Sequence, residues 1–112
     1  MKPEAVVQRQ LDAYNAHDVD CFLAVYSDGV CAYRPPSTEP AMSGKAAFAE
    51  FYSTQRFNQP GLHAELVNRI VLGNVVIDHE RITGVREQPF EVAVVYQVRD
   101  GLIEKTWTFA AE

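Results

Sequence analysis

Two short turn sequences in the second half of the chain constrain the fold more than any other feature. Gly73-Asn74 and Asp100-Gly101 combine residues that accept the positive φ angles of a tight hairpin turn. Each turn is flanked by runs rich in valine, isoleucine and aromatic residues, which are typical of strands. The sequence therefore predicts two antiparallel hairpins, made from strands over residues 62–72, 75–83, 90–99 and 102–109.

The first half of the chain is predicted to be mainly helical. Apolar residues recur at helical spacing from Val6 to Tyr14, and Asp18 is a good N-cap for a second helix that carries Tyr26 near its end. A short strand over residues 30–34 follows, and Ser43 opens a third helix. Because each helix has an apolar stripe to bury, we expect all three to cover one face of an antiparallel sheet. The predicted fold is a single α+β domain over residues 1–112.

The composition excludes several functional classes. The chain has 112 residues, 47% of them hydrophobic, and a net charge of -5, with no basic patch that would bind nucleic acid. No apolar run is long enough to span a bilayer, and no signal-peptide core is apparent, so we expect a cytoplasmic protein without a membrane partner. Cys21 and Cys31 lack metal-ligand spacing, and we expect reduced, semi-buried thiols. We expect no metal and no cofactor.

Several segments of the first half resemble the bacterial ketosteroid isomerases. They are AVVQR from Ala5, YNAHD from Tyr14, Glu39-Pro40, Ser43-Gly44 and Phe51-Tyr52. The order of helices and strands is similar to that of the wider nuclear transport factor 2-like (cystatin-like) superfamily, which includes the SnoaL-like polyketide cyclases. The resemblance implies a cone-shaped, curved sheet around an apolar pocket, and a homodimer formed through the outer face of that sheet.

The same resemblance implies that the isomerase's catalytic set is missing. Those enzymes hold the substrate oxygen with a tyrosine and a protonated aspartic acid, and they move the proton with an aspartate base. The matching positions hold Gln10, Tyr96 and Arg34, respectively. A guanidinium stays protonated, so Arg34 cannot accept a proton and true steroid isomerisation is not expected. We expect these three side chains to hold a ligand's carbonyl or carboxylate. The alternative places Arg34 at the pocket rim, paired with Glu39 or Glu65.

The predicted strand over residues 75–83 offers His79 as a general base in place of the missing aspartate. If Val75, Ile77 and His79 face the pocket, Asp78 and Glu80 face outward. His79 is then predicted to be the general base and Tyr96 the oxyanion donor. The alternative is a structural imidazole hydrogen-bonded to a carbonyl or a tyrosine. The side chains expected to line a site for a ring-shaped hydrophobic ligand are Tyr14, Ile77, Tyr96, Trp107 and Phe109.

Three functions remain open at this point. The first is an enzyme that isomerises, cyclises or hydrates a small hydrophobic carbonyl compound. The second is a non-catalytic protein that binds such a molecule, with Arg34 recognising its carboxylate. The third is a dimeric scaffold with a vestigial pocket.

Overall fold

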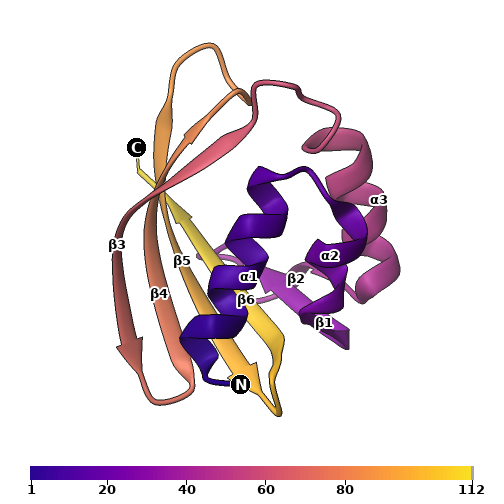
Figure 1. Ribbon diagram of the computed structural model, residues 1–112, viewed down its shortest axis with the longest axis vertical. Helices are drawn as coiled ribbons and strands as arrows, with labels where there is room; N and C mark the ends of the chain where they lie inside the picture. The colour runs from indigo at the N-terminus through magenta and orange to yellow at the C-terminus, as the bar shows by residue number, and fades with distance from the viewer. Residues whose placement is uncertain (112) are drawn as a thin grey trace.

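The computed structural model describes residues 1–111, which form three helices and six strands (Figure 1). The helices are α1 (Pro3–Asn15), α2 (Val19–Ala24) and α3 (Lys45–Gln55). The strands are β1 (Tyr26–Tyr33), β2 (Pro40–Ser43), β3 (His63–Leu72), β4 (Val75–Thr83), β5 (Phe90–Arg99) and β6 (Leu102–Ala110).

The six strands form one curved sheet in the order β2-β1-β6-β5-β4-β3. Both predicted hairpins are confirmed, since β3 pairs antiparallel with β4 and β5 with β6. Their turns contain Gly73 at φ 60° and Asp100 at φ 51°, as hairpin turns require. The sheet is antiparallel, as predicted, at every neighbouring pair of strands except one, because β1 runs parallel to β6. Between these two strands the chain passes through β2, α3 and strands β3 to β5, and β6 then lies between β5 and β1 in the sheet.

The three helices lie on the concave side of the sheet, as predicted (Figure 1). α1 crosses the sheet and buries Val6, Val7 and Leu11 against it, while Phe22 of α2 and Phe48 of α3 are also buried in the core. The opposite face of the sheet has no helix over it within the described chain (Figure 1). No helix among residues 1–111 is both long and apolar enough to cross a membrane. The expected cytoplasmic location stays a prediction.

Local boundaries differ from the prediction around the two short helices. Asp18 caps α2 as predicted, because its side chain accepts a hydrogen bond of 3.0 Å from the backbone N–H of Cys21. The thiol of Cys21 was expected to be semi-buried, but this residue is exposed. α2 ends at Ala24, so Tyr26 belongs to β1 and not to the helix. Ser43 does not open α3, because it pairs with β1 as the last residue of β2.

The loop between β4 and β5 approaches the segment before β3 closely at two glycines, Gly84 and Gly61. Gly84, after β4, has a φ of 86°, and a Cβ atom added there would lie 2.2 Å from the carbonyl carbon of Gly61. A side chain at this position would therefore meet both strained backbone and a fixed neighbour. The contact joins the β4–β5 loop to the segment that precedes β3.

Candidate functional site

A cavity of about 100 Å³ lies between the helices and the inner face of the sheet. Much of its wall is aromatic, and α1, α3 and the strands all contribute side chains to it. The aromatic lining residues are Tyr14, Tyr26, Phe51, Tyr52, Phe90 and Tyr96.

Four of the predicted site residues line this cavity. Gln10 and Tyr14 lie one helical turn apart on α1, Tyr96 comes from β5, and Arg34 follows β1. Gln10 and Tyr96 are buried, whereas Arg34 is exposed, so Arg34 lies where the cavity opens to solvent. Within residues 1–111 it forms no ion pair with Glu39 or any other acid. The structure thus brings these four side chains to one place, and their roles stay predictions.

His79 and Ile77 do not face this cavity, and the expected orientation of β4 is wrong. Val76, Asp78 and Ile82 are buried on the inner face, while His79 is exposed on the outer face and pairs with Glu91 of β5. The two faces of β4 begin with Val75 and Val76, respectively, which are both aliphatic. The alternation of side chains alone therefore could not predict which face is buried. The set that faces inward has an aliphatic residue at each end, and the charge of its Asp78 is compensated by the partly buried Arg69 of β3.

Trp107 and Phe109 also lie on the outer face, contrary to expectation. An extra residue at Glu104 interrupts the pairing of β5 with β6, because Val98 pairs with Ile103 and Gln97 with Lys105. This bulge reverses the alternation, so that Ile103 and Thr106 both face inward although they are three residues apart.

Two of the residues that were predicted to line the pocket, Ile77 and Trp107, lie instead in a transverse apolar row, which runs across the strands on the outer face. Ile70, Ile77, Val95 and Trp107 are successive cross-strand partners, and Tyr33 of β1 ends the row. The rings of Tyr33 and Trp107 stack with centroids 5.6 Å apart. Ile77 and Trp107 therefore contribute to an outer apolar surface instead of a pocket.

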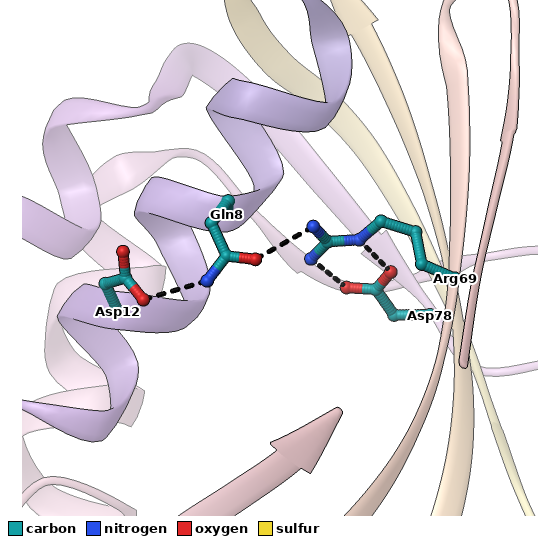
Figure 2. A network of polar contacts seen from close by, with 4 residues as sticks. All are labelled: Gln8, Asp12, Arg69 and Asp78. Carbon is teal, nitrogen blue, oxygen red and sulfur yellow. Dashed lines mark hydrogen bonds and ion pairs between the residues drawn. The ribbon is translucent and has the colours of Figure 1, made fainter. Parts of the chain in front are cut away.

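The central charge on the inner face of β4 belongs to a network that reaches α1 (Figure 2). Asp78 is fully buried and accepts two hydrogen bonds from Arg69 of β3, from Nε at 2.7 Å and from Nη2 at 2.9 Å. Arg69 Nη1 donates to the Gln8 side chain at 2.9 Å, and Gln8 in turn donates to Asp12 at 2.9 Å. The bidentate pair compensates the Asp78 charge in the interior.

Glu80, two residues further along β4, has no such partner. Its cross-strand neighbours on the inner face are Leu66 and Val92, which cannot donate hydrogen bonds. Glu80 is 5% exposed and lines the cavity, and among the described residues 1–111 its Oε2 atom has no hydrogen-bond partner. Burial, followed by the negative charge of Asp78, raises the pKa of Glu80 to about 7, although Arg69 opposes the shift. Both protonation states of this carboxyl group are therefore populated near neutral pH.

The other polar groups of the cavity include phenols that keep their protons. Burial is the main cause that raises the pKa of Tyr14, Tyr26 and Tyr96 far above the ordinary value, and the nearby Glu80 charge adds to it. Each remains an O–H donor at any physiological pH. Gln10 Oε1 is, like Glu80 Oε2, a buried acceptor without a partner. The cavity wall thus combines the carboxyl group of Glu80, phenols that can donate hydrogen bonds, and the amide oxygen of Gln10, which accepts none from the described residues.

The sequence analysis missed Glu80. The available signal was the pattern Val76, Asp78, Glu80 and Ile82, in which two acids share a strand face with two aliphatic residues. A buried acid is rare without a functional or structural reason. Within residues 1–111 no three His, Cys, Asp or Glu side chains come together in a way that could hold a metal ion.

The fold and the cavity define the class of cone-shaped α+β pocket proteins, and solved structures share this architecture. An uncharacterized cystatin fold protein from Novosphingobium aromaticivorans has a TM-score of 0.89 at 22% identity, with 97% of this chain and 98% of that chain covered. A candidate ketosteroid isomerase from Kribbella flavida has a TM-score of 0.84 at 20% identity, with 98% and 78% covered. A candidate polyketide cyclase from Sinorhizobium meliloti has a TM-score of 0.80 at 15% identity, with 94% of each covered.

The chain belongs to the SnoaL-like domain family, whose sequence profile matches residues 7–106. The predicted superfamily and the α+β cone are therefore confirmed. At these low identities the solved structures show a shared fold and do not show a shared chemistry of the cavity.

Proposed function

We propose that the cavity binds a small hydrophobic molecule with a carbonyl or carboxylate group, and that Glu80 exchanges a proton with it. The observation that carries this proposal is the unpartnered Glu80 oxygen inside a cavity, on a group with a pKa of about 7. A general base works best when its pKa lies near the working pH. Glu80 takes over the role that the sequence had suggested for His79, which lies on the other face of the sheet.

The proposed reaction is the isomerisation of a β,γ-unsaturated carbonyl compound. The Glu80 carboxylate removes a proton from the carbon between the carbonyl and the double bond, the electron pair of the broken C–H bond forms a new C=C bond, and the π electron pair of the carbonyl moves onto its oxygen. A phenol such as that of Tyr96 donates a hydrogen bond to this oxygen. The protonated Glu80 then returns the proton to a different carbon, which restores the carbonyl and moves the double bond.

The volume of the cavity limits the size of the substrate. A cavity of about 150 Å³ in another protein takes up one benzene molecule, whereas the cavity here measures about 100 Å³. The enclosed volume is therefore far too small for a four-ring steroid, and a one-ring or short-chain compound fits only by extending through the opening beside Arg34. This supports the expectation that steroid isomerisation is absent.

Proton exchange with a one-ring ketone tests the catalytic role directly. The probe is 3-cyclohexen-1-one in deuterated buffer, with deuterium uptake next to the carbonyl followed by NMR. The wild type should accelerate uptake, and Glu80→Gln should reduce the acceleration by about a hundredfold or more. The matched control is Glu65→Gln, which alters an exposed acid on β3 and should leave the rate unchanged. Equal rates for the wild type and Glu80→Gln would remove Glu80 from the reaction.

A second candidate function is ligand binding without chemistry. It is favoured by Arg34, a permanent cation that lines the cavity where the resembled isomerases have their base. Native mass spectrometry of the purified protein separates the two candidates when combined with the exchange assay. A small molecule retained by the protein, together with no deuterium uptake, would support a binding protein.

We also propose that the chain forms a homodimer through the outer face of its sheet. The transverse apolar row lies there, and Ile70, Leu72 and Phe109 are 53%, 73% and 46% exposed. An exposed apolar surface with polar pairs beside it, such as His79 with Glu91, has the composition of a dimer interface. Sedimentation equilibrium should give twice the monomer mass, and a monomer at all concentrations would contradict the proposal.

A further inference from the structure

Two arginines line the cavity, and they come from different elements. Arg34 follows β1, and Arg56 follows the last residue of α3. Burial raises the pKa of Tyr52, and the charges of Arg34 and then Arg56 lower it, so both guanidinium groups lie near the same phenol. Within the part of the chain that the structure describes, neither arginine has an acidic partner within ion-pair distance, although the chain carries a net negative charge.

Arg56 is held in place without using most of its donors. Its Nη1 donates a hydrogen bond of 2.8 Å to the backbone carbonyl of Gln55, and its guanidinium carbon lies 4.8 Å from the centre of the Phe51 ring. A guanidinium has five N–H donors, so several remain for a ligand. An arginine fixed on an aromatic ring is also well suited to a planar anion such as a carboxylate.

The buried end of the cavity has the opposite character. Gln10 Oε1 and Glu80 Oε2 are both unpartnered, and both residues are 5% exposed. An amide oxygen can only accept a hydrogen bond, so a ligand that satisfies Gln10 Oε1 must bring a donor to it. Glu80, when ionised, would repel a carboxylate placed at this end of the cavity. A ligand anion therefore has to face the arginines.

We propose that the cavity is a site for a one-ring carboxylic acid with a hydroxyl group at its far end. The carboxylate binds Arg34 and Arg56 at the mouth, the ring packs among the tyrosines, and the hydroxyl donates to Gln10 Oε1. This inference rests on the proposed function, in that it assumes that the cavity takes up a small molecule, and it adds the class and the orientation of the ligand. The enclosed volume of about 100 Å³ is smaller than a cavity that takes up benzene, so the carboxylate end of the ligand extends through the opening beside Arg34.

Three matched probes test the charge and the orientation by titration calorimetry. They are 4-hydroxybenzoate, its neutral methyl ester, and p-cresol, which keeps the ring and the hydroxyl group but has no carboxylate. The wild type should bind 4-hydroxybenzoate about tenfold more tightly than either neutral probe, because charge-assisted hydrogen bonds form at a partly exposed site. This preference should shrink as salt is added.

The double substitution Arg34→Ala with Arg56→Ala should abolish the preference while p-cresol binding stays unchanged. The control Arg81→Ala removes an exposed arginine from the outer face of β4 and should leave the preference intact. Gln10→Leu should weaken 4-hydroxybenzoate more than benzoate, since only the former carries the hydroxyl group.

The outcomes separate this inference from the proposed function. If p-cresol binds and 4-hydroxybenzoate binds no more tightly, or if the preference survives in the double variant, the anion site is refuted while a binding cavity stands. If neither compound binds the wild type, both the anion site and the proposed binding function are refuted. Circular dichroism of each variant confirms that a lost preference does not reflect a lost fold.

Discussion

Replacing Glu80 with glutamine should remove a large part of the pH dependence of folding stability around neutral pH. In the folded chain the carboxyl group is 5% exposed and has an unpartnered oxygen, so its charged form is disfavoured. In the unfolded chain the same group is solvated and ionises at its ordinary pKa of 4.5. Glutamine has nearly the same shape and cannot ionise, so the substitution isolates the cost of the charge.

The direction of the effect follows from the proton balance. Below the unfolded pKa of 4.5 both states carry the proton, and the protonated folded form has its full stability. Between 4.5 and about 7 the unfolded chain loses the proton while the folded chain keeps it, so the free energy of unfolding falls as the pH rises. Above about 7 the loss is complete. The difference between the two pKa values corresponds to about 3 kcal/mol.

Urea denaturation across the range from about pH 5 to about pH 8.5 measures this loss without adding salt. The wild type should lose about 2–3 kcal/mol more than Glu80→Gln over that range, which is on the order of 10 °C in melting temperature for a domain of this size. All other ionisable groups are common to both proteins, so their contributions cancel in the comparison. Glu65→Gln, an exposed acid, should reproduce the wild-type curve.

Parallel stability curves for the wild type and Glu80→Gln would refute the reasoning. They would mean that Glu80 is ionised in the folded chain at the same pH as in the unfolded chain. A wild type that gains stability over the variant as the pH rises would reverse the sign and require a cationic partner for Glu80.

Three further predictions address the network, the loops and the assembly. Asp78→Asn should cost about 2 kcal/mol, because it leaves the partly buried Arg69 guanidinium without its carboxylate partner, and should also lower the pKa of Glu80, as measured by urea denaturation and by carbon NMR titration; an unchanged Glu80 titration would contradict it. Gly84→Ala should lower the free energy of unfolding by about 2 kcal/mol or more in denaturation experiments. Gly73→Ala should lower it by about 1 kcal/mol, because an added Cβ atom there meets no described atom within 4 Å. Equal losses of stability would contradict the close approach of the two loops. Ile70→Asp should convert the proposed dimer to a monomer in light scattering without unfolding it, and a retained dimer would place the interface elsewhere.

The elements that local chemistry determines could be predicted from the sequence. The turns at Gly73 and Asp100 define the hairpins, and Asp18 caps its helix, because the residues involved are adjacent in the chain. The parallel pairing of β1 with β6 could not be predicted, since it depends on contacts between segments about 75 residues apart. The two residues of β2 nearest the helix, Met42 and Ser43, are likewise held by a partner strand and not by their own propensity.

The candidate site was predicted only where helix geometry or the resemblance determined it. Gln10 and Tyr14 share one face of α1 by their spacing, and Tyr96 was correctly placed inward. The orientation of β4 depends on the partner of Asp78, which is Arg69 from another strand. A binary pattern treats an acid as a surface residue, so it could not identify Glu80 as the polar centre of the cavity.

The bulge at Glu104 gives this architecture a way to change its ligand without changing its fold. Beyond it, the hydroxyls of Thr106 and Thr108 border the hollow, and the large rings of Trp107 and Phe109 lie outside. Deleting this single residue would exchange the two sets, replacing a polar wall with an indole and a phenyl group. Insertions and deletions in the last strand can thus remodel specificity as effectively as substitutions, and a comparison of relatives that ignores strand phase would overlook the switch.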